Sequence, residues 1–316
     1  MTKRIAIIDT ANQDIGLKIL FPEADYFVIY DEIDKSQSLQ KYNIQKKYDI
    51  ENINDLQYDY LFIIISLYDA IPGSVFHKQN IESGLHRILE IVNKNNFKKV
   101  FLFDNYDYDY DPNDYLQNSK INLYFKRNYN KTKTYNANVI PFSFIMFGEY
   151  SMIEIIDRNK RTLSDHAENR LFFTGTLFNH IDHQLKYYRN RRALYDKIQN
   201  MIYNPGNMSF QDFIDTMNRS KFSLDLNGVG DPNKRTFEIF SQGSLRISEH
   251  NDMLWCFGED FSPETIFYDE HDLQKKLELL RSDEQLYNKC LTRQNELVTK
   301  YFNVNWIRSY VEERYL

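Results

Sequence analysis

The sequence predicts an α/β protein of two domains, each a parallel sheet covered by helices. Apolar runs of strand length recur in the first half, at residues 5–8, 26–29, 60–65 and 100–103. Such continuous runs are typical of strands that are buried on both faces, as in parallel sheets. Segments with apolar residues at helical spacing alternate with strand-like runs in both halves. The length of 316 residues fits two domains of about 150 residues each.

The first domain is expected to span residues 1–150. Between its third and fourth apolar runs, residues 81–92 place apolar side chains at helical spacing. Strand, helix and strand in this order form the crossover unit of a doubly wound sheet.

The second domain is expected to span residues 151–300, with a polar linker at 157–170. Its pattern predicts strands at 171–176, 221–226 and 244–247, and helices at 191–201, 210–219, 234–241, 272–280 and 284–301. A short helix at 306–313 lies in a terminal segment, 301–316, that can pack back on the first domain. Alternation of strands and helices in both halves indicates two helix-covered sheets.

Composition and charge argue against several functional classes. Lys and Arg total 39 against 45 Asp and Glu, and the net charge of −6 argues against a nucleic-acid partner. The two cysteines, Cys256 and Cys290, provide neither a disulfide framework nor a cysteine zinc site. The first apolar run is too short for a signal peptide, and no later run approaches the length of a membrane span. We therefore expect a cytoplasmic protein without an integral membrane segment.

The most informative segment is 220–244, where a predicted buried strand ends in a loop and a helix follows. Asn227 and Gly228 begin the loop, and Asp231 or Asn233 can cap the helix. Free N–H groups and the positive dipole end at a helix N-terminus attract phosphates, and glycine lets them come close. Arg235 and Glu238, three residues apart on one helix face, could bind a phosphate and ribose hydroxyls. The same pair also fits an ordinary solvated helix surface.

The segment resembles the GT-B glycosyltransferases, which have two Rossmann-like domains facing across a cleft, and particularly their exostosin-like and glycosyltransferase-family-one members. The resemblance rests on a small residue and Lys before a strand, an Arg and a Glu three apart, and a glycine turn into the next strand: Ser220, Lys221, Arg235, Glu238 and Gly243. Arg246 departs from the pattern because it stands inside that next, apolar strand. The resemblance covers about residues 124–283.

Two further segments support the resemblance. The basic pair Lys126 and Arg127 is followed by a segment with Pro141, as in similar proteins before the crossing between domains. The strand at 171–176 ends in a turn with Gly175, and Arg191 lies on the helix after it.

By this resemblance, a nucleoside-diphosphate sugar would bind with its diphosphate against residues 228–235 and its ribose near Glu238. Gly175, Arg191, Asn227 and Gly228 would border the donor, and Lys126, Arg127 or Arg191 would help balance the diphosphate charge, so that neither a metal nor another cofactor is required. The sugar would pass to a hydroxyl of a glycan or glycosylated carrier.

An inverting transfer needs a base for the acceptor hydroxyl, whereas a retaining transfer does not, and the sequence leaves both open. In this architecture the base comes from a loop of the first domain. Asp69 is the first candidate because Pro72 and Gly73 indicate a loop there, and Asp104 and Asp9 also end apolar runs. A helix cap or a surface turn is the competing interpretation for each of the three aspartates.

Three different functions stay open beside this interpretation. Acidic residues at 107, 109 and 111 follow a predicted strand and could form the metal motif of a single-domain transferase. They do not form a calcium loop, because Pro112 takes the place of the required glycine. A non-catalytic nucleotide-sugar-binding module and a DNA-modifying glucosyltransferase also fit the sequence.

His180 and His183 lack a further metal ligand, and no nucleophile elbow, Walker loop or dinucleotide glycine turn occurs.

Overall fold

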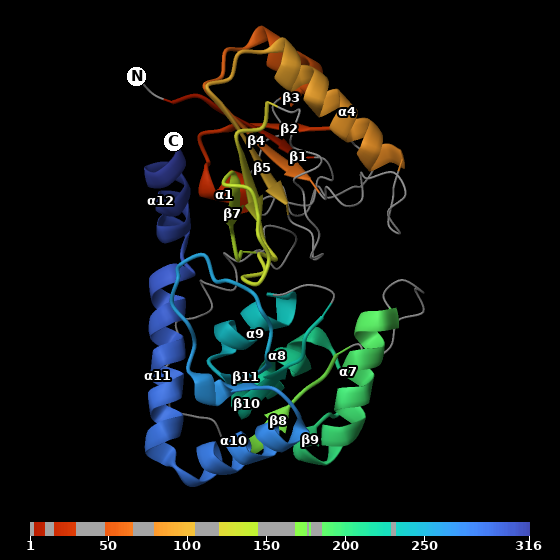
Figure 1. Ribbon diagram of the computed structural model, residues 1–316, viewed down its shortest axis with the longest axis vertical. Helices are drawn as coiled ribbons and strands as arrows, with labels where there is room; N and C mark the ends of the chain where they lie inside the picture. Colours follow the sequence, from red (N-terminus) through yellow and green to blue (C-terminus); the bar gives the residue numbers. More distant parts are fainter. Residues whose placement is uncertain are drawn as a thin grey trace. The chain divides into compact units, whose positions relative to one another are not determined.

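The computed structural model describes residues 3–9, 16–29, 48–65, 79–104, 120–144, 168–175, 177, 185–228 and 232–316. The chain divides into two compact units, Met1–Ser151 with Met253–Cys256 and Met152–Asp252 with Phe257–Leu316. Each unit contains one parallel sheet (Figure 1). The α/β class and the two parallel sheets predicted from the sequence are confirmed.

The described strands of the N-terminal unit form a sheet in the order β3-β2-β1-β4-β5-β6-β7, with every neighbouring pair parallel. This order reverses direction between β1 and β4, as in doubly wound folds. The strands are β1 (Ile5–Asp9), β2 (Asp25–Val28), β3 (Tyr48–Asp49), β4 (Tyr60–Ile65), β5 (Lys99–Asp104), β6 (Leu123–Lys126) and β7 (Val139–Pro141). Helices α1 (Gly16–Leu20) and α4 (Gln79–Lys94) and the 3-10 helix η1 (Ile50–Asp55) accompany them.

The described strands of the C-terminal unit form a second sheet in the order β12-β11-β10-β8-β9, again parallel throughout. They are β8 (Glu168–Phe172), β9 (Ile202–Tyr203), β10 (Ser220–Asp225), β11 (Leu245–Glu249) and β12 (Ile266–Phe267). In Figure 1, α11 (Glu284–Tyr301) and α7 (Leu185–Ile198) lie on opposite sides of these strands. The remaining helices are α8 (Phe210–Arg219), α9 (Lys234–Gln242), α10 (Glu270–Ser282), α12 (Val304–Tyr315) and the 3-10 helices η3 (Gln199–Met201) and η4 (Pro263–Thr265).

Local capping explains where these helices begin and end. Five of them start after a side chain that accepts a hydrogen bond from a backbone N–H of the first turn, which satisfies a donor that the helix itself leaves unpaired. The capping residues are Ser209, Asn233, Asp269, Asp283 and Asn303. Helix α9 ends at Gln242 and is capped by Gly243, whose φ of 67° lies in the left-handed region that favours glycine.

Apolar side chains from each sheet form separate cores. In the N-terminal unit, strands β1, β4 and β5 and helix α4 supply a buried cluster that includes Ile8, Ile63, Leu102 and Ile88. In the C-terminal unit, Leu224 and Ile247 of the sheet pack with Leu277 of α10 and Leu291 of α11. These fully buried strands account for the continuous apolar runs in the sequence.

The structure corrects several expected boundaries. Glu168–Phe172 forms β8, so the last residues of the expected linker belong to a strand, and that strand ends before Gly175. Arg170 is exposed, which explains why the start of β8 has a polar sequence. Helix α7 starts at Leu185, earlier than the expected 191. Among the helices that the structure describes, none combines the length and apolar character needed to cross a bilayer.

Candidate active site at the carboxyl ends of β8 and β10

The strand order places a candidate site at the carboxyl ends of β8 and β10. These neighbours lie where the second sheet reverses its order, and open α/β sheets bind ligands in the crevice at such a point. Residues 173–175 follow β8, and residues 226–228 follow β10 and lead toward α9. The first turn of α9 therefore begins at the edge of the sheet where a ligand is expected.

Asp225, the last residue of β10, holds this first turn in place. Its carboxylate accepts hydrogen bonds from the Thr236 hydroxyl (Oγ1 to Oδ2, 2.7 Å) and the Asn233 amide (Nδ2 to Oδ1, 3.3 Å). Asn233 in turn caps α9 by accepting from the backbone N–H of Thr236 at 3.3 Å. The strand and the helix are thus joined by side-chain hydrogen bonds at the site itself.

Arg235 lies in this turn with its guanidinium between aromatic rings. The guanidinium carbon is 5.0 Å from the ring centre of Phe173 and 5.4 Å from that of Phe213. A Cβ added at Gly175 would lie 2.9 Å from Nη2 of Arg235, so the guanidinium passes directly over the glycine. The side chain forms no hydrogen bond or ion pair with the described residues. A cation held on aromatic rings without a hydrogen-bonded acceptor is suited to bind an anion.

Burial shifts the pKa values of Arg235 and Glu238 in opposite directions. Desolvation lowers the pKa of the Arg235 guanidinium, while the charges of Glu238 and Asp225 oppose that shift. Desolvation raises the pKa of the Glu238 carboxyl, while Arg235 and Lys234 oppose it. Glu238 is 7% exposed, and its Oε1 is 3.9 Å from Nζ of Lys234. Perturbed groups that share a cleft edge mark functional-site candidates.

Arg191 supports the loop after β10. Its Nε donates to the carbonyl of Asn227 at 3.0 Å, and its Nη2 donates to the carbonyl of Leu226 at 3.4 Å. The backbone N–H of Asn227 donates to Oε2 of Glu249 at 2.9 Å, and its side-chain amide donates to the carbonyl of His250 at 2.8 Å. Burial raises the pKa of the Glu249 carboxyl. Arg191 therefore fixes the backbone of the loop instead of presenting all its donors to a ligand.

The structure brings six of the eight expected donor-binding residues to this edge of the second sheet: Gly175, Arg191, Asn227, Gly228, Arg235 and Glu238. The other two, Lys126 and Arg127, belong to the N-terminal unit. Lys126 ends β6, and both residues are at most 1% exposed.

Two expected catalytic aspartates are at the carboxyl edge of the first sheet. Asp9 ends β1 and accepts a hydrogen bond from the Tyr26 hydroxyl at 2.5 Å. Asp104 ends β5 and accepts one from the Tyr124 hydroxyl. Both carboxylates are buried, at 0% and 3% exposure, and both bind tyrosines. Asp69, the first candidate for a base, lies outside the described residues.

Within the described ranges, no group of three or more His, Cys, Asp or Glu side chains is placed so that it could bind a metal ion. The acidic run at 107–111 and the pair His180 and His183 lie outside these ranges, as do Thr176 and Asp231.

Sequence reasoning missed the residues that surround Arg235. Phe173 directly follows β8, and Phe213 lies on α8. Only the packing of the folded chain shows that both rings cover the guanidinium. Arg246, which departs from the family pattern, pairs with Asp225 (Nε to Oδ2, 2.6 Å) inside the sheet. The sequence offered one signal for this pair. Asp225 and Arg246 are charged residues within two predicted apolar strands, and buried charges require partners.

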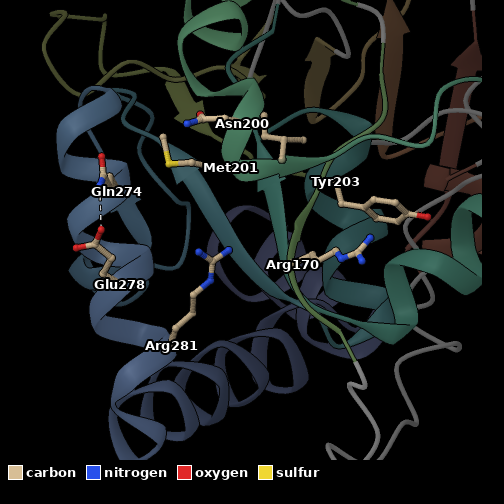
Figure 2. Close-up of a pocket in the computed structure, with 8 residues that line it drawn as sticks. Arg170, Asn200, Met201, Tyr203, Gln274, Glu278 and Arg281 are labelled. Carbon is tan, nitrogen blue, oxygen red and sulfur yellow. Dashed lines mark hydrogen bonds between the residues drawn. The ribbon is translucent and has the colours of Figure 1, made fainter.

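A cavity of about 540 Å³ lies in another part of the C-terminal unit, lined by residues of β8, η3, β9 and α10 (Figure 2). Arg170 extends over the ring of Tyr203, 4.9 Å from its centre, whereas Arg281 points toward Met201. Because the two guanidinium groups do not converge, we assign the cavity no ligand.

Comparison with solved structures shows the fold. The chain is similar to T4 phage BGT in complex with UDP-glucose, with a TM-score of 0.53 and 13% identity over 99% of this chain and 100% of that one. It is similar to T4 phage BGT in complex with UDP and Mn2+ (TM-score 0.52, 12% identity, 99% and 100% coverage). A third structure, the DNA modifying enzyme β-glucosyltransferase studied with and without uridine diphosphoglucose, gives 0.50 and 12% identity over 98% of both chains.

At these identities the likeness establishes the GT-B type of fold, with two parallel-sheet α/β domains. No family model matches the sequence, and no curated protein matches it. The exostosin-like resemblance therefore stays a prediction.

Proposed function

We propose that the chain is a glycosyltransferase that takes a sugar from a nucleoside diphosphate bound at the carboxyl ends of β8 and β10. The observation that carries the proposal is the Arg235 guanidinium, which stacks on Phe173 and Phe213 and forms no hydrogen bond with the described residues. Its position in the first turn of α9 adds the positive end of the helix dipole. A bound diphosphate would pair with the guanidinium and lie at the positive end of the helix dipole.

The other residues of the site have distinct expected roles. Glu238, one turn along α9, would accept hydrogen bonds from the ribose hydroxyls, as acidic residues do in nucleotide sites. Gly175 would let the diphosphate approach the backbone beside Arg235. Arg191 would hold the loop with Asn227 and Gly228 in the shape that borders the donor.

The transfer needs little covalent chemistry from the protein. The bond between the anomeric carbon and the diphosphate oxygen breaks, and the acceptor oxygen bonds to that carbon as its hydroxyl proton leaves. Negative charge grows on the departing diphosphate, where Arg235 and the helix N-terminus would stabilise it. In an inverting transfer a carboxylate of the first domain would accept the proton; Asp69 is our first candidate, followed by Asp104 and Asp9.

The test is thermal stability of the purified protein with UDP, GDP, CDP, ADP, dTDP and their sugars, first without metal and then with Mn²⁺. A ligand at a hundred times its dissociation constant adds about 2.7 kcal/mol of stability. We expect one nucleotide family to raise Tm in the wild type and in the control Arg219→Ala, an exposed arginine of α8, and to raise it clearly less in Arg235→Ala and Glu238→Ala at the same ligand concentration. A chain that no nucleotide stabilises would refute the proposal.

Turnover separates the transferase from a binding module. Release of free nucleoside diphosphate from the stabilising sugar donor, with or without an acceptor, identifies an enzyme, whereas binding without release identifies a module. The same series compares activity with and without Mn²⁺, since one similar structure was solved with UDP and Mn²⁺.

DNA is a second candidate acceptor beside glycans and glycosylated carriers. The support is the similarity to a DNA modifying enzyme over 98% of the chain, which offsets the argument from the net charge of −6. Retention on duplex DNA that weakens steeply with salt, together with sugar transfer to DNA bearing hydroxyl groups on its bases, would support this acceptor. Transfer to a glycan alone would exclude it.

A further inference from the structure

Asp225 is the centre of a buried polar cluster that joins three elements of the C-terminal unit. One oxygen, Oδ2, accepts from Nε of Arg246 on β11 at 2.6 Å and from Oγ1 of Thr236 on α9 at 2.7 Å. The other, Oδ1, accepts from Nδ2 of Asn233 at 3.3 Å. Asp225 is 2% exposed and Thr236 0%, so these contacts are shielded from water. Each contact is consequently stronger than it would be on the surface.

Arg246 is also held by helix α11. Its backbone N–H donates to Oε1 of Gln294 on α11 at 2.9 Å, and Nε2 of Gln294 donates to the carbonyl of Ser244 at 2.8 Å. Its guanidinium carbon is 6.0 Å from the ring centres of both Phe240 and Phe261. The arginine cannot shift without disturbing α11 and this aromatic packing, so Asp225 is bound to a fixed partner.

We infer that Asp225 and Arg246 are positioning residues of the proposed donor site, acting through Thr236 and Asn233 on the first turn of α9. Arg235 lies between those two residues in the chain, and Glu238 follows on the next turn. The cluster therefore fixes the backbone from which both donor-binding side chains project. It also explains why the buried strand β11 contains an arginine. The inference rests on the proposed function.

Direct replacement of Asp225 or Arg246 is a poor test, because either change leaves a buried charge without its partner and destabilises the fold. Thr236→Val is sharper. It keeps the shape of the side chain and the ion pair between Asp225 and Arg246, and removes only the hydroxyl that links the carboxylate to α9. Thr236→Ser restores that hydroxyl. Thr216→Val is the matched control, since Thr216 is a buried threonine of α8 outside the Asp225 cluster.

The experiment measures the affinity of each full-length variant for UDP, GDP, CDP, ADP and dTDP by calorimetry. Thr236→Val should weaken binding of the preferred nucleotide about 3- to 10-fold, while Thr236→Ser and Thr216→Val stay close to the wild type. Combined with Arg235→Ala, the Thr236→Val change should cost less affinity than in the wild type, because part of its effect acts through Arg235. A merely structural role would give the same loss in both backgrounds.

The outcomes separate this inference from the function on which it rests. Wild-type protein that binds none of the nucleotides overturns the proposed function and the inference together. Wild-type protein that binds a nucleotide, with Thr236→Val binding equally well or losing affinity equally with and without Arg235, overturns the positioning role alone.

Discussion

The guanidinium of Arg235 lies directly over the backbone of Gly175. A methyl group at Gly175 would be 2.9 Å from Nη2 and 3.3 Å from the guanidinium carbon of Arg235, closer than side chains normally approach. The glycine that follows β8 and the arginine of α9 thus form one feature, although they are sixty residues apart in the sequence. Glycine is needed here for space.

Gly175→Ala should therefore weaken nucleotide binding with little loss of stability. The obstructed group is the end of a flexible side chain, so Arg235 can move aside while the fold persists. We expect affinity for the preferred nucleoside diphosphate to fall about tenfold, as for the loss of one charge-assisted hydrogen bond. Calorimetry measures the affinity and thermal melting the stability. Adding Gly175→Ala to Arg235→Ala should cost less affinity than in the wild type; an equal loss in that background would contradict the contact.

Replacing Arg235 should separate function from stability. Arg235→Met keeps a long side chain against Phe173 and Phe213 but removes a charge whose desolvation lowers its pKa. We expect the Tm of the ligand-free protein to equal or exceed that of the wild type, since partly buried charges without partners destabilise. Nucleotide affinity should fall about 10- to 100-fold. A large loss of Tm together with unchanged affinity would show that the arginine is only structural.

Glu238 should distinguish nucleosides from free phosphates. If its carboxylate binds ribose, Glu238→Gln weakens the binding of the nucleoside diphosphate about tenfold but leaves inorganic pyrophosphate unaffected, whereas Arg235→Met weakens both. Glu278→Gln, an exposed glutamate of α10, serves as the control. Equal weakening of both ligands by Glu238→Gln would assign the residue to the phosphates.

The same variant has a predicted pH dependence. Burial raises the pKa of Glu238, so the folded chain holds this proton at pH values where the unfolded chain has lost it. The group therefore destabilises the fold increasingly as the pH rises from about 4.5 through the raised pKa. Glu238→Gln should melt higher than the wild type at neutral pH, and this difference should shrink toward about pH 4.5. A constant difference across that range would contradict the shifted pKa.

Much of the fold could be predicted because its signals are local. Buried parallel strands such as Tyr60–Ile65 are continuous apolar runs, and helices such as Phe210–Arg219 begin after capping residues. Strands β3, β9 and β12 were missed because each has two residues, too few to show a pattern. Glu168–Phe172 was split because its first three residues are polar.

The candidate site could be predicted only where its residues are close in sequence. Arg235 and Glu238 were found because one helix turn joins them. The partners of Asp225 depend on the register of β10 and β11, which sets Asp225 against Ser248 and brings Arg246 within reach. The tyrosines that bind Asp9 and Asp104 come from neighbouring strands in the same way. Sequence spacing contains no information about such register.

Glu259 should give the C-terminal unit an acid-sensitive stability. Hydrogen bonds from Lys300, Tyr301 and Arg293, all on α11, lower the pKa of its carboxyl to about 2. A depressed pKa contributes stability that is complete above the ordinary value of 4.5 and disappears as the pH falls through about 2. Glu259→Gln should lower Tm at neutral pH and lose this part of the pH dependence, measured by melting between about pH 7 and pH 2. Glu296→Gln, an exposed glutamate of the same helix, should melt like the wild type throughout. Parallel pH curves for wild type and Glu259→Gln would show that the carboxylate does not hold α11.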